Sequence, residues 1–280
     1  MKRTFEDWLV VSDIDGTLHN KMRKLPQRNY DVIKKFTDLG GNFTLATGRT
    51  VSSLVRPYGS VPANQPAIIL NGSGIYDMKK QKLLHSRTIG EKGMKFVHDI
   101  IERYSDPLFS VDVAVYCSDM IYVVKNGILS HATMMIDKSP HTFVKDFDSI
   151  PQDGWMRVMF WGMPKVIEYL TNYIASVENP DANFMLSSPV TIEMLQKDTH
   201  KGVGVMMLAK DLGIRKDHVA AIGDYFNDWD MLKTVGLPAC AGQAPKRIQQ
   251  ICKFKACHCN QGCVADLIEF IMYKNGGLPE

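Results

Sequence analysis

The sequence of 280 residues lacks features that would assign it to several large protein classes. It has no basic block and a formal charge of only +3, so it shows no electrostatic footprint for nucleic acid or for an acidic membrane surface. No window approaches the roughly 18 apolar residues of a membrane span. Residues 1–11 do not resemble a signal peptide, because their short apolar run is preceded by Glu6 and Asp7. We therefore expect a cytoplasmic protein without nucleic-acid or membrane partners.

Cysteine is sparse except in one stretch near the C-terminus. The stretch 252–263 holds four of the six cysteines, Cys252, Cys257, Cys259 and Cys263, with His258 among them. The C-x2-C spacing of structural zinc sites is missing, and no second His or Cys pair lies nearby. We interpret these residues as reduced thiols that pack as small hydrophobic side chains, and the sequence assigns the stretch no function.

Nucleotide-binding loops are also missing. The sequence contains no G-x4-G-K-[ST], and Gly72-Ser-Gly74 lacks the third glycine of a dinucleotide-binding fingerprint. No internal repeat or low-complexity segment is visible. The sequence is that of a globular protein whose chemistry does not depend on either of these glycine-rich loops.

Apolar runs and amphipathic stretches alternate in the first part of the chain. We expect strands at residues 9–12, 43–46 and 67–70. Helical spacing predicts a helix over residues 30–39, ended by Gly40 and Gly41. A second helix is expected over 50–56, with Pro57 stopping it. Strands that alternate with helices predict parallel βαβ units with both sheet faces covered.

The pattern changes in the middle of the chain and then returns. Helices are expected at 92–104 and 165–177, and strands at 111–116, 120–124, 157–161, 183–186 and 191–195. Neighbouring hairpin-like strands of this kind indicate an antiparallel α+β module. After His200, a helix at 203–212 and strands at 219–222 and 237–241 resume the first pattern. We predict a doubly wound α/β core over 1–84 and 188–280, with an inserted α+β domain over 85–187.

Acidic and other polar residues follow directly on three of the expected strands. The stretch VVSDIDGTLHN begins at Val10 and carries two aspartates at the end of an apolar run. The three sets are Asp13, Asp15, Gly16 and Thr17; Thr47, Gly48 and Arg49; and Asp224, Asn227 and Asp228. Ligands of open parallel sheets bind outside the carboxyl ends of the strands. If the three strands are neighbours, these residues converge on one crevice.

The convergence of carboxylates predicts a divalent cation. Close, buried carboxylates repel each other and lose hydration, so they need a cation, hydrogen bonds or a reaction to stabilise them. Asp13, Asp15 and Asp224 offer oxygen ligands. Mg²⁺ prefers such ligands and binds through one or two carboxylates together with a substrate phosphate. We expect a magnesium site here.

Four motifs, DIDGTL, ATGR, HKG and GDYFND, occur in the order and setting of the haloacid dehalogenase superfamily. The chain resembles the Cof-type phosphatases of class IIB over nearly its whole length, and LNGSG at Leu70–Gly74 resembles another element of that branch. The insertion between Thr47 and Lys201 corresponds to the family's C2 cap. Two residues depart from the common pattern of the family. His200 stands where Asn or Ser is usual, and Gln243 stands where Asn is usual.

The resemblance implies hydrolysis of a phosphate monoester through an aspartyl-phosphate intermediate. Asp13 would be the nucleophile, and Asp15 the general acid and then base. Asp13, Asp224 and the backbone carbonyl of Asp15 would hold Mg²⁺. The residues expected to contact phosphate or substrate are Gly16, Thr47, Gly48, Arg49, Asn71, Lys201 and Asn227. Asp228 would hold Lys201 or a metal-bound water.

The substrate and the oligomeric state stay open at this point. A sugar phosphate is the substrate that the resemblance favours. In the insertion, Tyr116, Tyr122, Arg157 and Trp161 could contact a sugar or fill the core of a sheet. The alternatives are a phosphomannomutase-like phosphotransferase, which needs a cationic cluster in the cap for a second phosphate, and a phosphometabolite-binding protein without catalysis.

Overall fold

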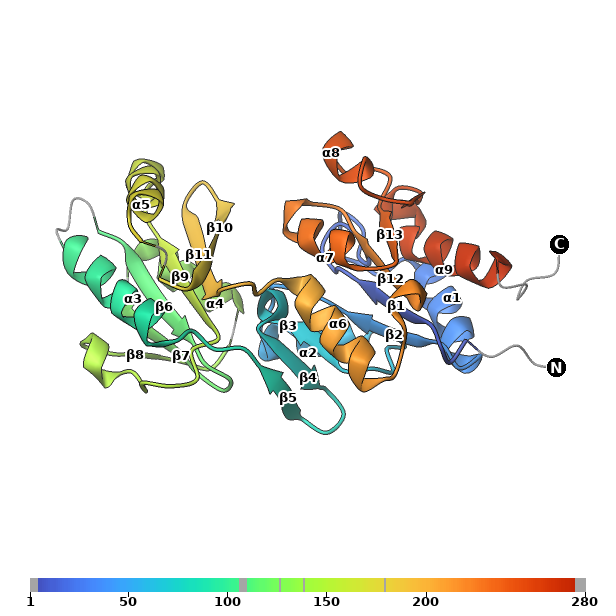
Figure 1. The fold of residues 1–280 in the computed structure, drawn as a ribbon, viewed down its shortest axis with the longest axis horizontal. Helices are drawn as coiled ribbons and strands as arrows, with labels where there is room; N and C mark the ends of the chain where they lie inside the picture. The colour runs from blue at the N-terminus through green and yellow to red at the C-terminus, as the bar shows by residue number, and fades with distance from the viewer. Residues whose placement is uncertain (1–4, 106–109, 126, 138, 179, 275–280) are drawn as a thin grey trace. The chain divides into compact units, whose positions relative to one another are not determined.

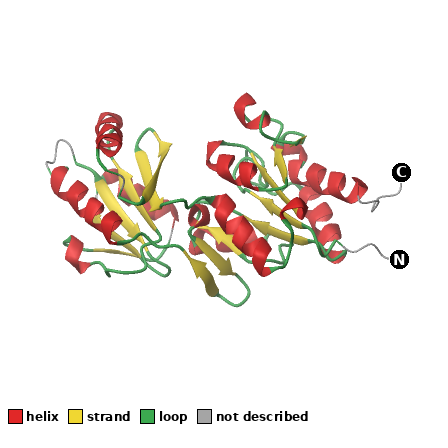
Figure 2. Cartoon of the chain, in the orientation of Figure 1, coloured by secondary structure: helices red, strands yellow, loops and turns green. Residues whose placement is uncertain are grey.

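The computed structural model describes residues 5–105, 110–125, 127–137, 139–178 and 180–274. The chain divides into two compact units (Figures 1 and 2). The first consists of residues 1–49, 54–84 and 200–280, and we call it the catalytic unit. The second consists of residues 50–53 and 85–199 and is called the inserted unit. Among the described residues, no helix combines the length and apolar character needed to cross a membrane.

The catalytic unit is built on a parallel sheet of five strands in the order β14-β13-β12-β1-β2. The strands are β1 (Leu9–Ser12), β2 (Asn42–Leu45), β12 (Val219–Gly223), β13 (Leu237–Cys240) and β14 (Phe254–Lys255). Every residue of β1 and β12 is buried. Strands covered on both faces need apolar side chains on both, which explains their continuous hydrophobic runs.

Helices cover both faces of this sheet (Figure 1). They are α1 (Gln27–Asp38), α2 (Val51–Gly59), α6 (Lys201–Asp211), α7 (Trp229–Thr234), α8 (Lys246–Gln249) and α9 (Cys263–Lys274). Leu9 and Val11 share a core with residues of α6 and α7, among them Val205. Helices α1 and α9 pack against each other. The predicted doubly wound α/β class is therefore confirmed.

A small sheet of β3 (Ala67–Ile69), β4 (Gly74–Asp77) and β5 (Lys82–Ser86) extends this architecture. Strand β3 follows β2 through a parallel bridge between Ala46 and Ile68, but its pairing with β4 is antiparallel. The turn between β3 and β4 contains Leu70 and Asn71 in left-handed backbone conformations, with φ of 48° and 54°. Asn tolerates this conformation better than most residues.

The inserted unit has a six-stranded sheet in the order β10-β11-β9-β6-β7-β8, antiparallel except for β7 and β8. Its strands are β6 (Asp112–Tyr116), β7 (Ile121–Lys125), β8 (His141–Phe143), β9 (Arg157–Trp161), β10 (Ala182–Ser188) and β11 (Thr191–Gln196). Its helices are α3 (Glu91–Arg103), α4 (Ile128–Asp137) and α5 (Pro164–Ser176). Val113, Val158 and Phe160 form its core with Phe96 and Leu170.

One boundary of the inserted unit differs from the sequence interpretation, and the structure decides an alternative that the sequence left open. The chain leaves this unit after Thr199 and not near residue 188, because Thr191–Met194 pair with β9 and so belong to its sheet. Tyr116, Arg157 and Trp161 are at most 4% exposed. Arg157 lies 3.4 Å from Glu193 and stacks over the Tyr116 ring, so these side chains contribute to the core of the sheet.

Candidate active site

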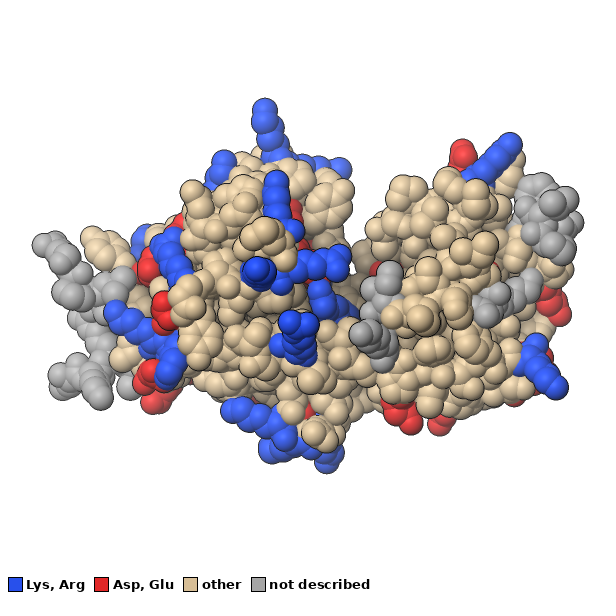
Figure 3. Space-filling model, turned by 180° about the vertical axis from the view of Figure 1, so that it is seen from behind, with Lys and Arg blue, Asp and Glu red and all other residues tan. Residues whose placement is uncertain are grey.

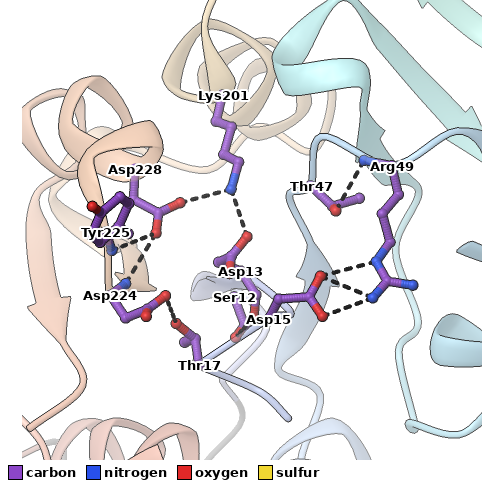
Figure 4. A network of polar contacts seen from close by, with 10 residues as sticks. All are labelled: Ser12, Asp13, Asp15, Thr17, Thr47, Arg49, Lys201, Asp224, Tyr225 and Asp228. Atoms are coloured by element: carbon purple, nitrogen blue, oxygen red, sulfur yellow. Dashed lines mark hydrogen bonds and ion pairs between the residues drawn. The ribbon is translucent and has the colours of Figure 1, made fainter. Parts of the chain in front are cut away.

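The carboxyl ends of β1, β2 and β12 bring the three sets of polar residues together (Figure 4). Strand β1 pairs with both neighbours up to its last residue, Ser12, which lies opposite Leu45 and Ile222. The pairing continues in two backbone hydrogen bonds, from Asp13 N to Ile222 O and from Ala46 N to Ser12 O. The aligned strand ends therefore place Asp13, Thr47 and Asp224 at one edge of the sheet.

Lys201 contacts two aspartates in the centre of this site. It is the first residue of α6, and its Nζ lies 2.6 Å from Asp13 Oδ1 and 2.7 Å from Asp228 Oδ1. All three side chains are buried. Burial alone would lower the pKa of Lys201, but attraction to Asp13 and Asp228 outweighs it and raises that pKa. Lys201 therefore carries a positive charge among the carboxylates.

The negative charge of the site exceeds what one lysine neutralises. Burial raises the pKa of Asp13 to about 7 against the attraction of Lys201, and repulsion from Asp228 and Asp224 adds to the rise. Burial and repulsion from Asp228 raise the pKa of Asp224 to about 6. Three carboxylates share one ammonium group, so a further cation would stabilise their ionised forms.

Asp228 holds the backbone of the site. Its Oδ2 accepts hydrogen bonds from the backbone N–H of Asp224 at 3.0 Å and of Tyr225 at 3.4 Å, while Oδ1 accepts from Lys201. A Cβ on Gly223 would lie 2.3 Å from that Oδ2, so only glycine fits beneath this carboxylate. Both oxygens of Asp228 thus accept hydrogen bonds from protein groups, and its supporting role in the site stays a prediction.

Two carboxylates of this cluster, those of Asp13 and Asp224, fit a metal ion. Asp13, Asp224 and Asp228 each present an oxygen within 4.8 Å of the others. Lys201 donates to Asp13 Oδ1, and Thr17 donates to Asp224 Oδ1. Within the described part of the chain, the other oxygen of each carboxylate, Oδ2, makes no hydrogen bond. A hard divalent cation such as Mg²⁺ prefers oxygen donors of this kind. The donor set therefore fits the magnesium expected from the sequence, through Asp13 and Asp224.

Asp15 lies apart from the buried carboxylates and pairs with Arg49. The Arg49 guanidinium donates to both oxygens of Asp15 at distances of 2.7 to 3.1 Å (Figure 4). The Asp15 side chain is 52% exposed. Since that side chain points to Arg49, its expected contribution to a metal site would come from its backbone carbonyl. The same side chain remains accessible to a substrate.

Glycines and threonines shape the loops around these carboxylates. Gly16 has a φ of +83°, and a Cβ there would lie 2.4 Å from Asp224 Oδ2, so its backbone passes directly beside that carboxylate. Thr17 Oγ1 donates to Asp224 Oδ1 at 3.1 Å. No role is predicted for the Thr17 side chain from the sequence, although Thr17 belongs to the Asp-Gly-Thr turn that indicates the site. The loop after β1 therefore holds the carboxylate of Asp224, a candidate metal ligand, in place.

The loop after β2 joins the turn after β3. Thr47 Oγ1 accepts a hydrogen bond from the Arg49 N–H, and the Asn71 N–H donates to Thr47 O. A Cβ on Gly48 would lie 3.0 Å from Asn71 Nδ2, so the Asn71 amide packs against this glycine. Thr47, Gly48, Arg49 and Asn71 are therefore neighbours, and their contact with a common ligand stays a prediction.

Asn227 is the predicted site residue with the least structural support. It is exposed in the short turn before α7, and its side chain makes no hydrogen bond within the described part of the chain. Its proposed contact with phosphate or with a metal-bound water stays a prediction.

Comparison with known proteins identifies a family. Residues 10–268 match the haloacid dehalogenase-like hydrolases. The chain is 24% identical over 246 residues to the 5-amino-6-(5-phospho-D-ribitylamino)uracil phosphatase YcsE of Bacillus subtilis. It is 22% identical over 247 residues to the HMP-PP phosphatase of Yersinia pseudotuberculosis. Each match covers 86% of both chains.

A solved structure shows the same fold. The HAD subclass IIB sugar phosphatase BT4131 superposes with a TM-score of 0.75 at 15% identity, covering 97% of this chain and all of that one. The family match spans far more than half of the chain and includes all four motifs. The chain belongs to the haloacid dehalogenase-like hydrolases, as its motifs predicted, and it is a hydrolase of the phosphatase type.

Proposed function

We propose that the protein is a magnesium-dependent phosphatase that hydrolyses small phosphate monoesters, sugar phosphates above all, through an aspartyl-phosphate intermediate. The observation that carries the proposal is the buried contact of Lys201 with Asp13, at the edge of the sheet where ligands of such folds bind. The sugar preference rests on the sequence motifs and on the likeness to a sugar phosphatase. The proposal includes the cytoplasmic location expected from the sequence.

The first half of the reaction transfers the phosphoryl group to the protein. An Asp13 carboxylate oxygen forms a bond to phosphorus, and the bond between phosphorus and the ester oxygen breaks. Asp15 gives its proton to the departing alcohol oxygen. Lys201, which contacts Asp13, and the hydroxyl of Thr47, in the loop after the neighbouring strand β2, would stabilise the charge of the phosphoryl oxygens. In the structure Arg49 holds Asp15 in a two-pronged ion pair, so Asp15 has to leave Arg49 before it can carry the proton that it donates.

The second half regenerates the enzyme. Asp15, now ionised, takes a proton from a water molecule as that water attacks phosphorus. The bond to the Asp13 oxygen breaks, and inorganic phosphate leaves. One carboxyl group thus acts as acid and then as base. Its partial exposure next to Arg49 gives both the alcohol and the water access to it.

Asp13 and Asp224, with the Asp15 carbonyl, are the residues that would hold Mg²⁺. When bound, the ion would offset the repulsion between the Asp13 carboxylate and the phosphate dianion. The chain's own residues supply the rest: Asp228 fixes the turn that carries Asp224, and Thr17 orients its carboxylate.

The charge of the catalytic unit supports an anionic substrate. Within its bounds the sequence has 23 Lys and Arg residues against 15 Asp and Glu, a net +8, whereas the inserted unit has 10 against 15, a net −5. Figure 3 shows Lys and Arg side chains spread over one face of the molecule. A positive unit attracts phosphate esters over distances beyond direct contact, an effect that salt weakens.

The proposal is tested by measuring phosphate release from a panel of sugar phosphates, nucleotides and phosphorylated cofactors. We expect release with Mg²⁺, highest for sugar phosphates, and none in excess EDTA. Hexose 1-phosphate separates the alternatives, because a mutase would isomerise it without releasing phosphate. Full activity in EDTA would contradict the metal assignment. Tight binding of a phosphate ester without phosphate release from any member of the panel would contradict the assignment of catalytic activity.

Magnesium is expected to stabilise the protein more at about pH 8 than at about pH 5. The pKa values of Asp13 and Asp224 rise in the folded protein from 3.8 to about 7 and about 6. The metal-free folded state therefore holds protons more tightly than the unfolded state, and loses stability as the pH rises from about 4 through about 7. A bound cation replaces those protons.

The measurement is the melting temperature at each pH with and without Mg²⁺, at constant ionic strength. At 100 times its dissociation constant, the ion adds about 2.7 kcal/mol to the free energy of unfolding. The rise in melting temperature should shrink at the lower pH, where protons occupy the same oxygens. An equal rise at both pH values argues against binding to these carboxylates.

A further inference from the structure

Three side chains from other segments donate hydrogen bonds to the backbone carbonyls of the loop that follows Asp15. Gly16 O accepts a hydrogen bond from Gln243 Nε2 at 2.5 Å, and Thr17 O accepts one from Cys263 Sγ at 3.2 Å. Leu18 O accepts one from Asn29 Nδ2 at 2.9 Å. Three consecutive carbonyls thus have partners from outside the loop. The proposed mechanism uses none of these partners.

Gln243 joins the loop to the Cys-rich stretch. While its Nε2 donates to Gly16, its Oε1 accepts from the backbone N–H of Cys259 at 3.0 Å. The Gly242 N–H in turn donates to Cys257 O at 2.8 Å, and a Cβ on Gly242 would lie 3.0 Å from Ala256 O. The segment around Gln243 is therefore packed tightly against residues 256–259, which makes it a fixed support.

The position of the loop determines how Asp224 lies. Gly16 passes beside the Asp224 carboxylate without room for a Cβ, and Thr17 donates to the same carboxylate. A displacement of Gly16 by a fraction of an ångström would therefore move Thr17 relative to Asp224, and both relative to Asp13. At Gly16 itself, the side chain that limits such a displacement is that of Gln243.

We propose that Gln243 is a positioning residue, which fixes the Gly16–Thr17 turn so that Asp13 and Asp224 keep the spacing needed for a divalent cation. This inference rests on the proposed function. It gives a role to Gln243, one of the departures from the family pattern, and to the Cys-rich stretch, which supplies its second hydrogen bond. A shorter Asn at this position cannot reach both partners without a backbone movement.

Gln243→Glu tests the proposal in the full-length protein. The variant keeps the size and the acceptor oxygen, but it loses the N–H that donates to Gly16 and places a negative charge against that carbonyl. Residues that orient metal ligands change affinity by about 10- to 100-fold when they are replaced. We expect the Mg²⁺ concentration for half-maximal rate to rise about 10-fold, with little change in the KM for substrate. Gln243→Asn should show a smaller change of the same kind.

Asn64→Asp is the matched control. Like Gln243, Asn64 uses both atoms of its amide: Nδ2 donates to Gly41 O and Oδ1 accepts from the Phe43 N–H, each at 2.9 Å, and neither partner belongs to the catalytic loop. Its replacement should lower the melting temperature by a similar amount and leave the Mg²⁺ dependence unchanged. A comparison of the two variants therefore separates lost positioning from lost stability.

Amide hydrogen exchange without substrate gives a readout independent of catalysis. The Leu18 and His19 N–H groups donate within the loop, to Asp13 O and Ile14 O. Gln243→Glu should speed their exchange by up to about 10-fold, the largest factor expected from the loss of one hydrogen bond. Unchanged exchange in the loop, or equal effects of Gln243→Glu and Asn64→Asp on Mg²⁺ dependence, would overturn the inference. Failure of the wild type to release phosphate, with altered exchange in the variant, would instead reject the proposed function.

Discussion

Replacing Asp13 by Asn is expected to reduce phosphate release by about 10⁴-fold or more, the scale seen when an enzyme loses its nucleophile. An amide cannot form the bond to phosphorus that the proposed scheme requires. The change is nearly isosteric, and Asn can still accept the hydrogen bond that Lys201 donates at 2.6 Å. The fold should therefore survive, and the initial rate of phosphate release at saturating substrate measures the loss.

Asp230→Asn is a suitable control for this experiment. Asp230 lies near the active-site turn, on α7, but it is exposed and its side chain makes no hydrogen bond in the described part of the chain. That variant should keep its full rate. An Asp13→Asn protein that keeps more than a tenth of the wild-type rate would show that another group attacks phosphorus, or that a water molecule attacks directly.

Replacing Lys201 by Met is expected to remove activity and to lower the free energy of unfolding by about 3–5 kcal/mol, the range found when a buried ion pair loses one partner. The Asp13 and Asp228 carboxylates would then lie buried without the ammonium group between them. Folding would favour their protonated forms, so the loss should be greatest at high pH and shrink as the pH falls. Urea unfolding at two pH values measures both effects.

Lys210→Met provides the comparison on the same helix. Lys210 is exposed in the last turn of α6, so its replacement should change stability by less than about 0.5 kcal/mol. If Lys201→Met is as stable as Lys210→Met at every pH, the charge of Lys201 does not stabilise the carboxylates. The electrostatic description of the site would then be wrong.

The sequence predicted the catalytic unit well where a polar residue directly follows a buried strand. Asp13, Thr47 and Asp224 are such residues, and the alignment of parallel strands places them at one edge without any knowledge of side-chain packing. Gly40 was also a reliable signal, because its φ of +91° fits the end of helix α1.

Three features of the structure were not predicted from the sequence. Pro57 was expected to stop a helix, but α2 continues to Gly59, because a proline in the last turn leaves only one backbone acceptor without its partner. Helix α4 has no clear sequence signal, and Ile128 at its start is 88% exposed. The contact between Gln243 and Gly16 joins residues 227 positions apart, and nothing in either local sequence indicates it.

The pairing of β1 with β12 has a consequence for biosynthesis. Thr17 and Asp224 are separated by 207 residues, and a ribosome adding 5–20 residues per second would need roughly 10–40 seconds to make the chain between them. During that interval the apolar Leu9–Ser12 segment has only β2 as an available neighbour. The inserted unit, apart from residues 50–53, is continuous in the chain and emerges before β12 does. Chaperone binding to the nascent chain should therefore concentrate on its first 50 residues until translation passes Gly223.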